Sequence, residues 1–305
     1  AGGEELVSGP VGIRVSSPGR DAWRRFRKNW AAMISLAVVI LLVIAAIFAP
    51  FLHTSGIQAY DINSLDVGPS AHHWFGTDNN GADLYSLILY GLRVPLIVGV
   101  LGTLITVGVG TLIGVASGYF GGIVDSLLAR FTDLMFAFPA FILALIIVSL
   151  YGQALDQYFG GGSGRVIVLT CVFAFVSWPP LTRFVRSLAL AMREQQFVEA
   201  ARTSGSSNWK IIRRHLLPNM YGLILVQAAL ITVGIIYTET TLSIFGLGVQ
   251  PPNPDLGQLL WNGAQNVELF GYLVVFPSIF LVVLLLAFTF IGDGVRDAVD
   301  PRMNS

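Results

Sequence analysis

A polar segment between two long apolar runs holds the residues whose types and spacing best suit contact with another protein. In order along the chain it contains Glu199-Ala200-Ala201, then Gly205, then Leu217-Pro218. Two adjacent alanines on an exposed helix let a second surface approach closely, and the neighbouring Glu and Arg side chains can orient it. An amphipathic hairpin of this kind can also lie on lipid headgroups. The residues alone leave these two interpretations open.

Local signals predict two short helices within this segment. A first helix is expected over 193–204, ended by Gly205, because glycine suits the left-handed backbone that follows many helices. Ser206 or Ser207 can cap a second helix, and Pro218 is expected to reset the backbone before the next apolar run. The apolar faces expected of the two helices consist of Phe197, Ala200 and Ala201 in the first and Trp209, Ile212 and Leu216 in the second.

The sequence offers no catalytic or metal-binding constellation. The only lysines are Lys28 and Lys210, and neither follows a glycine in a Gly-Lys-Ser or Gly-Lys-Thr motif. A phosphate-binding P-loop therefore cannot be built, and we do not expect this chain to hydrolyse ATP. His72 and His73 are adjacent and point apart in regular structure, and His53 is distant, so we expect no metal site.

One acidic residue, Glu239, lies well inside an otherwise apolar run. An ionisable group in such a position usually faces protein or a water-filled path. Glu239, with Thr240 and Ser243, is therefore a candidate for lining such a path. An equally weighted alternative is that Glu239 accepts a structural hydrogen bond from a neighbouring helix.

The elements that must position these residues are membrane helices. Of the 305 residues, 54% are hydrophobic and only 12% are charged, and the net charge is zero. This composition excludes an ordinary soluble protein and gives no basic field for nucleic acid. Runs of about 20 apolar residues, the length that crosses a bilayer as a helix, predict an all-α polytopic protein with six spans. The predicted spans are 30–52, 94–118, 132–151, 166–189, 222–246 and 272–292.

The basic residues predict the orientation of these spans. If the N-terminus lies in the cytoplasm, all of the 18 Lys and Arg residues except Arg93 and Arg165 fall on the cytoplasmic side, as the positive-inside rule requires. Both termini are then cytoplasmic (N-in, C-in). The remaining segments are a cytoplasmic tail at 1–29, flexible over its first 20 residues, an extracytoplasmic loop at 53–92, a cytoplasmic loop at 190–221 and a C-terminal tail at 293–305, with 93–292 as the main transmembrane domain. Near the cytoplasmic surface, Asp125 and Asp133 are expected to pair with Arg130.

The spacing of the polar segment resembles the EAA loop of binding-protein-dependent ABC importer permeases. Further blocks in the same order resemble the C subunit of dipeptide and oligopeptide importers (the DppC/OppC family). These blocks are Trp23-Arg24-Arg25-Phe26-Arg27, His73-Trp74-Phe75-Gly76-Thr77-Asp78, Gly118-Tyr119-Phe120-Gly121-Gly122, Phe136-Ala137-Phe138-Pro139, Arg213-Arg214-His215-Leu216-Leu217-Pro218-Asn219, Phe245-Gly246-Leu247-Gly248-Val249-Gln250-Pro251-Pro252 and the run from Gly292 to Arg302. His215 departs from the general EAA pattern but fits this narrower branch. After Asp78 the run Asn79-Asn80-Gly81-Ala82-Asp83 lacks the Arg that the family usually has.

The resemblance implies a type I ABC importer (MetI-like) fold in the bacterial inner membrane. It also implies partners: a homologous B permease, two cytosolic ATPase subunits or domains that hold ATP and Mg, and an extracytoplasmic binding protein that delivers a peptide. The residues that would couple to the ATPases are Glu199, Ala200, Ala201, Gly205, His215, Leu217 and Pro218. The residues expected at the binding-protein surface are Trp74, Phe75, Asp78, Gln250 and Pro251.

The cargo is the least defined part of this interpretation. Dipeptides are the first expectation and oligopeptides the second, while relatives of this branch also move nickel chelates, glutathione or antimicrobial peptides. A secondary transporter is a weaker alternative, because it would need more ionisable groups near the bilayer midplane and usually an inverted repeat.

Overall fold

The structure is a computed structural model that describes residues 18–56, 61–160, 162–251 and 253–299. The predicted flexible tail before residue 18, the last six residues of the C-terminal tail and Pro252 lie outside this part of the chain. Helices dominate the described residues. The extended pairing found among them is one isolated bridge between Thr77 and Asp83.

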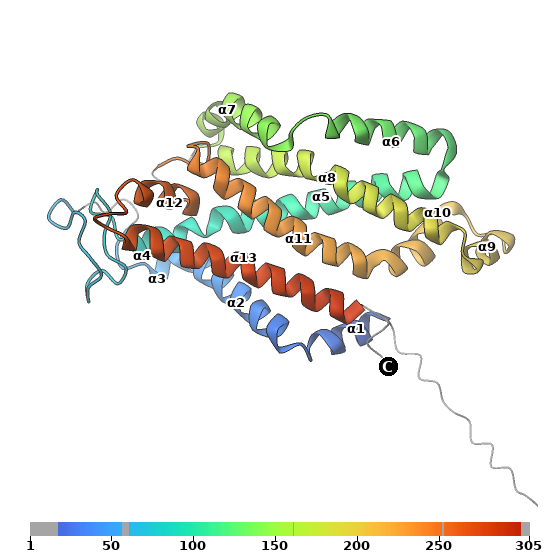
Figure 1. Ribbon diagram of the computed structural model, residues 1–305, viewed down its shortest axis with the longest axis horizontal. Helices are drawn as coiled ribbons and strands as arrows, with labels where there is room; N and C mark the ends of the chain where they lie inside the picture. Colours follow the sequence, from blue (N-terminus) through green and yellow to red (C-terminus); the bar gives the residue numbers. More distant parts are fainter. Residues whose placement is uncertain (1–17, 57–60, 161, 252, 300–305) are drawn as a thin grey trace, which may run out of the picture.

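Six helices in the described part are long and apolar enough to cross a membrane, which confirms the predicted number of spans. They run side by side along the long axis of the molecule (Figure 1). The spans are α2 (Trp30–Ile47), α4 (Leu84–Gly91) with α5 (Arg93–Phe120), α7 (Ala140–Phe159), α8 (Ser163–Arg193), α10 (Asn208–Ile211) with the π turn η1 (Ile212–Leu216) and α11 (Leu217–Ile244), and α13 (Tyr272–Val299). The shorter helices are α1 (Pro18–Phe26), α3 (Ala49–Leu52), α6 (Gly122–Phe136), α9 (Gln196–Thr203) and α12 (Leu256–Ala264).

The third span differs from the prediction of 132–151. The chain forms α6, breaks at Ala137 to Pro139, and then forms α7, which is the membrane-length helix. Pro139 has no N–H and disfavours helical backbone at the residue before it, so the apolar run divides at this point. Pro139 itself is extended (φ −61°, ψ 111°).

Ion pairs between helices hold α6 in place. Asp125 accepts two hydrogen bonds from Arg186 of α8, at 2.6 and 2.7 Å, and Asp133 pairs with Arg183 of α8 at 2.5 Å. The expected pairing of both acids with Arg130 is therefore wrong. Sequence spacing within one helix suggested Arg130, whereas the partners lie about 50 or 60 residues further along the chain.

Small residues allow the central helices to approach closely. Gly110 and Gly114 of α5 face Leu181 and Val185 of α8. A Cβ atom on either glycine would press against these side chains. The Thr182 hydroxyl donates to the carbonyl of Gly110 at 3.2 Å. Close backbone packing of this kind is typical of membrane helices, which lack a hydrophobic driving force between them.

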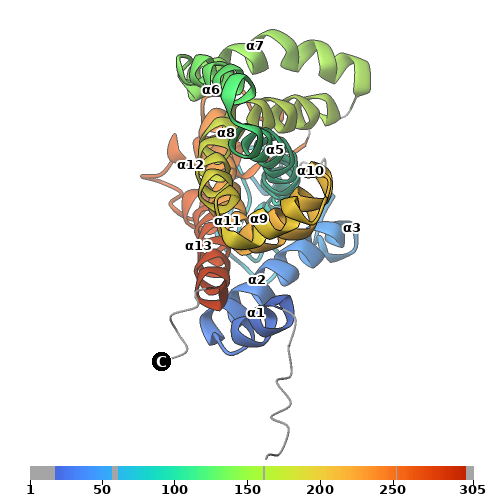
Figure 2. The same cartoon turned by 90° about the vertical axis from the view of Figure 1, so that its right-hand side faces the viewer.

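The two ends of the helical stack carry different elements. The α9–α10 hairpin, α1 and the end of α13 lie at one end, and Figure 2 shows this end facing the viewer. Residues 61–83, α3, α4 and α12 lie at the opposite end (Figure 1).

Candidate functional site

The polar hairpin folds as two helices joined by a tight turn. Gly205 adopts a left-handed conformation, with φ of +73°. Its N–H donates to the carbonyl of Arg202 at 2.9 Å, and the N–H of Ser206 donates to the carbonyl of Ala201 at 3.0 Å. These two bonds form a Schellman motif, which satisfies carbonyls at the end of α9. The predicted role of Gly205 as a helix terminator is confirmed, and Ser207 is the residue that caps α10.

The second helix of the hairpin continues without a break into the fifth span. The N–H of Leu217 donates to the carbonyl of Ile212, five residues earlier, and this is the bond that defines a π turn. The turn changes the hydrogen-bond register just before Pro218, which has no N–H to continue the α-helical pattern. The side chain of Asn219 then donates to the carbonyl of His215 at 2.6 Å. The expected backbone reset at Pro218 is therefore a widened turn inside one long helix.

The hairpin has one face turned toward the protein and one turned away. Val198, Ile211, Ile212 and Leu216 are buried together in a cluster with residues of α5, α8 and α11, and Ala201 packs against it. Phe197 is 40% exposed and Trp209 63% exposed. Trp209 thus does not share the buried face of Ile212 and Leu216, as its helical spacing suggested. Ala200 is exposed and Ala201 half-buried, so only the first of the two alanines is open to a partner.

A side chain at the end of α5 fixes the hairpin to the helical stack. Tyr119, at the end of α5, donates its hydroxyl to Asn208 Oδ1 at 2.9 Å. The guanidinium of Arg202 lies 5.3 Å from the centre of the Tyr119 ring, close enough for a cation–π contact. Sequence reasoning did not assign Tyr119 to the site. Its place in a family block was the only signal that pointed to it.

The remaining predicted coupling residues surround this exposed face. Glu199 is exposed in the first turn of α9, where the partial positive charge of the helix N-terminus favours a carboxylate. His215 and Leu217 are half-buried, and the His215 ring lies 6.4 Å from that of Phe197. The structure therefore brings Glu199, Ala200 and Gly205 together on the α9 side of one exposed hairpin.

The three residues proposed to line a path lie in the interior of the folded protein. Glu239, Thr240 and Ser243 are all buried. The Ser243 hydroxyl donates to Asp255, which caps the N-terminus of α12. Asp255 lies in a loop in the sequence and gave no signal there that it would meet Glu239.

The expected binding-protein surface is only partly accessible. Trp74 is 54% exposed, with its ring 4.9 Å from that of Tyr85. Phe75 is half-buried and its ring stacks on that of Phe276 of α13 at 4.3 Å, so less of it than of Trp74 is open to a partner. Asp78 accepts hydrogen bonds from the N–H groups of Asn80 and Ala82.

The second part of this surface lies beside a polar cavity. Pro251 is exposed, while the side chain of Gln250 donates to the carbonyls of Gly246 and Gly248. Both residues border a cavity of about 520 Å³, which residues of α7 and α8 also line. In its wall Arg165 pairs with Asp156 at 2.8 Å and donates to the carbonyl of Gly248 at 2.9 Å.

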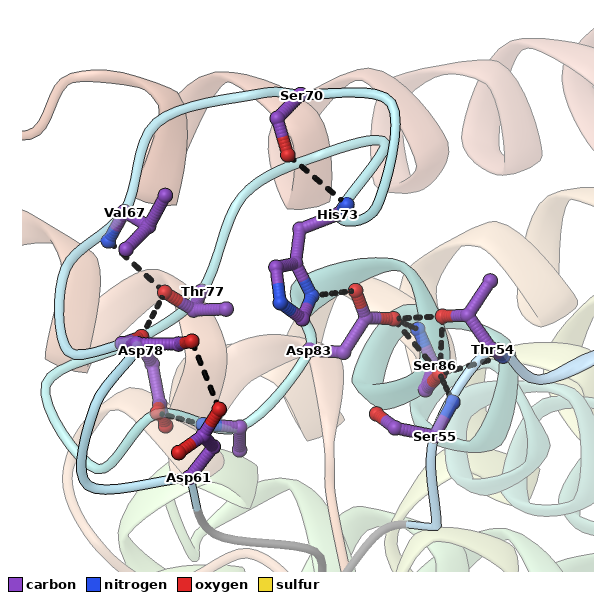
Figure 3. A network of polar contacts seen from close by, with 12 residues as sticks. Thr54, Ser55, Asp61, Val67, Ser70, His73, Thr77, Asp78, Asp83 and Ser86 are labelled. Atoms are coloured by element: carbon purple, nitrogen blue, oxygen red, sulfur yellow. Dashed lines mark hydrogen bonds and ion pairs between the residues drawn. The ribbon is translucent and has the colours of Figure 1, made fainter.

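A buried carboxylate, that of Asp83, ties Thr54 and His73 to the start of α4, as Figure 3 shows. Asp83 accepts hydrogen bonds from the hydroxyls of Thr54 (2.6 Å) and Ser86 (2.7 Å) and from the Ser86 N–H (3.0 Å). His73 Nδ1 lies 3.0 Å from its second oxygen. Burial alone would raise the pKa of Asp83, but these hydrogen bonds lower it below the usual range. His73 therefore has a structural partner in this loop.

Comparison with known proteins identifies the family. Residues 110–305 match the family described as binding-protein-dependent transport system inner membrane component, and residues 17–68 match the N-terminal transmembrane domain of oligopeptide transport permease C. The dipeptide transport system permease protein DppC of Alkalihalophilus pseudofirmus is 37% identical over 95% of this chain and 91% of its own length. The glutathione transport system permease protein GsiD of Shigella flexneri is 38% identical over 95% of this chain and 92% of its own.

A solved structure supports the fold. An inward-facing MetNI methionine ABC transporter aligns with a TM-score of 0.54 at 19% identity, over 71% of this chain and 98% of that chain. The six apolar helices fit a multi-pass protein of the bacterial inner membrane. The chain therefore belongs to the binding-protein-dependent ABC importer permeases, in the family of the dipeptide and oligopeptide C subunits.

Proposed function

We propose that this chain forms the translocation path of an ATP-driven peptide importer together with a homologous B permease, and that the α9–α10 hairpin receives the force from cytosolic ATPases. The observation that carries this proposal is the hairpin itself. It presents an exposed surface at the end of the helical stack, and α10 continues through η1 into the fifth span. ATP and Mg would be held by the partner subunits.

The contacts of the hairpin suit the transmission of a displacement. Its inner face is packed into a cluster shared with α5, α8 and α11, and Tyr119 adds a hydrogen bond from the end of α5. A packed cluster moves as a unit because its side chains cannot be compressed. A pull on the exposed face would therefore move several spans together, which is rigid-body transmission.

The outer face of the hairpin suits a protein partner better than lipid alone. The exposed surface combines Phe197 and Trp209 with Glu199, Ala200 and Arg202. Aromatic and Arg side chains are enriched in protein interfaces, and the small Ala200 leaves room for close approach. This arrangement requires the N-in, C-in orientation, which places the hairpin in the cytoplasm.

At the opposite end, we propose that an extracytoplasmic binding protein docks on a surface formed by Trp74, Gln250 and Pro251. Trp74 and Pro251 are exposed there. The polar cavity beside Gln250 offers amide and carboxylate groups that can bond to a partner's backbone. Dipeptides are the proposed cargo. Glutathione, itself a small peptide, is a second candidate, because the similar GsiD proteins are described as glutathione permeases.

The test is uptake by proteoliposomes that contain this chain, its B permease and its ATPases, with the binding protein and labelled peptide outside. We expect uptake that requires ATP inside and the binding protein outside, and competition by dipeptides. Competition by glutathione instead would assign the cargo to the second candidate. Uptake driven by an ion gradient without ATP would contradict the importer mechanism and support a secondary transporter.

A further inference from the structure

Two acidic side chains meet inside the protein, where α11 approaches α12. Glu239 of α11 and Asp255 at the start of α12 are both 0% exposed. The hydroxyl of Ser243, one helical turn after Glu239 on α11, donates to the carboxyl group of Asp255, so this carboxyl group lies beside the face of α11 that carries Glu239. Two carboxylates cannot form a hydrogen bond unless one of them carries a proton, because an ionised carboxyl group only accepts.

Asp255 has the donors that an ionised carboxylate needs. The hydroxyl of Ser243 donates to Oδ2, and the N–H of Gly257 donates to Oδ1 at 3.2 Å. The second of these bonds is part of the cap of α12, whose N-terminus also favours negative charge. Both oxygens of Asp255 are thus stabilised without any help from Glu239.

Glu239 lacks such donors. The hydroxyl of Thr240 lies 3.4 Å from Oε2, but its single hydrogen is donated to the carbonyl of Ile236 at 2.9 Å. Oε1 is buried and accepts no hydrogen bond from the protein. An ionised carboxylate in this position would be desolvated, without a donor and next to a second negative charge.

Other charged groups do not neutralise Glu239. Among the ion pairs formed by the described residues, none involves Glu239. The charged side chains at this end of the elements packed around the pair have partners elsewhere. These are Arg93 of α5, which donates to the carbonyl of Ala46, Arg165 of α8, which pairs with Asp156, and Asp83 before α4, which binds Thr54, Ser86 and His73.

From this geometry we propose that Glu239 and Asp255 form a buried site that holds one proton, bound to Glu239 and donated to Asp255, and that this bond fastens α12 to the fifth span. Helix α12 also packs against α13 and α4. The proton therefore helps to hold together the elements at the end of the stack opposite the hairpin. This inference does not depend on the proposed cargo or on the coupling role of the hairpin.

Infrared difference spectroscopy of the full chain in lipid nanodiscs tests the site. Subtracting the spectrum of Glu239→Gln from that of the wild-type chain at pH 7 should reveal the carbonyl stretching band of a protonated carboxyl group. This band should shift in D2O, because the proton exchanges. Asp125→Asn is the control, since Asp125 is paired with Arg186 and should contribute only the bands of an ionised carboxylate.

A second variant keeps the proposal testable if Glu239→Gln fails to fold. In Asp255→Asn the asparagine carbonyl can still accept the proton of Glu239, so the protonated-carboxyl band should remain at pH 7. If the spectrum of Glu239→Gln differs from that of the wild-type chain only in the bands of an ionised carboxylate, the proposal is wrong. Absence of the protonated band from both the wild-type chain and Asp255→Asn would overturn it as well.

Discussion

Replacing Gly205 by alanine should weaken coupling between ATP hydrolysis and transport while leaving the helical stack intact. Gly205 has φ of +73°, and no atom beyond its own residue and its chain neighbours lies within 4 Å of the position that a Cβ would take. The substitution therefore creates no clash. Its cost is backbone strain alone, because an L-residue with a Cβ disfavours the left-handed region.

The size of the effect follows from this strain. Left-handed backbone costs a residue with a Cβ roughly 1–2 kcal/mol, and this energy shifts an equilibrium by about 5- to 30-fold. The affected equilibrium is between the ordered hairpin, closed by the bonds from Gly205 to Arg202 and from Ser206 to Ala201, and a frayed hairpin. A frayed hairpin transmits less of the displacement, so we expect severalfold more ATP hydrolysed per peptide transported.

A second glycine of positive φ supplies a control. Gly160 follows α7 with φ of +72° and has no atom beyond its chain neighbours within 4 Å of a Cβ, but it lies far from the hairpin along the same stack. Its ψ of 164° places it in a backbone region that is essentially restricted to glycine, so Gly160→Ala should lower thermal stability at least as much as Gly205→Ala, without changing the ratio of ATP hydrolysed to peptide transported. Both quantities are measured in proteoliposomes that contain all subunits. Equal uncoupling in the two variants, or none in Gly205→Ala, would refute the coupling role of the turn.

Four further changes test the remaining assignments. Glu199→Trp should uncouple peptide uptake from ATP hydrolysis while the chain stays folded in the membrane, because Glu199 is exposed and a bulky residue disturbs the proposed contact without disturbing the core; unchanged uptake would contradict the coupling role. Crosslinking tests the docking surface in a chain whose single cysteine, Cys171, is replaced. Trp74→Cys should crosslink to the binding protein, whereas Phe75→Cys, at the half-buried neighbour, should not. Equal crosslinking of the two variants would contradict the docking surface. Asp83→Ala should lower the free energy of unfolding by roughly 2–4 kcal/mol, because a helix cap and buried hydrogen bonds are lost together. The pKa of Asp83 is lowered in the folded protein. Its stabilisation should therefore be present above about pH 4 and be lost as the pH falls further, which thermal unfolding at several pH values measures. Asp125→Asn should lower the free energy of unfolding by about 1–2 kcal/mol after allowance for solvent screening. Arg186 lowers the pKa of Asp125 to about 2. The wild-type chain should therefore be more stable than the variant above about pH 4, and this difference should disappear as the pH approaches about 2.

The elements that local sequence signals determine were predictable. Apolar length alone gave six spans, because a helix must satisfy its own backbone hydrogen bonds in lipid. Gly205 and Ser207 end and begin their helices as their conformational and hydrogen-bonding preferences require. In these cases the relevant partners lie within five residues of one another.

The features that depend on distant partners were not predictable from spacing. Asp125 binds Arg186, 61 residues away, instead of the nearer Arg130. The break at Pro139 moved the third span because an apolar run does not reveal where two helices divide it. Trp209 has the spacing of a buried residue, yet the neighbouring α5 and α8 cover only the other side of its helix.

The π turn shows how a local rule can be satisfied in an unexpected way. Proline normally ends or kinks a helix, and Pro218 was expected to reset the backbone at the start of the fifth span. Instead, the bond from Leu217 to Ile212 widens the turn, and α10 and α11 remain one helical body. A flexible break at this point would absorb a displacement of the hairpin, whereas a continuous helix passes it to residues further along α11. The same helix ends near Ser243, which binds Asp255. One continuous helical body thus joins the exposed hairpin at one end of the stack to the buried acid pair at the other, and under the proposed coupling role it would carry a displacement of the hairpin to α12.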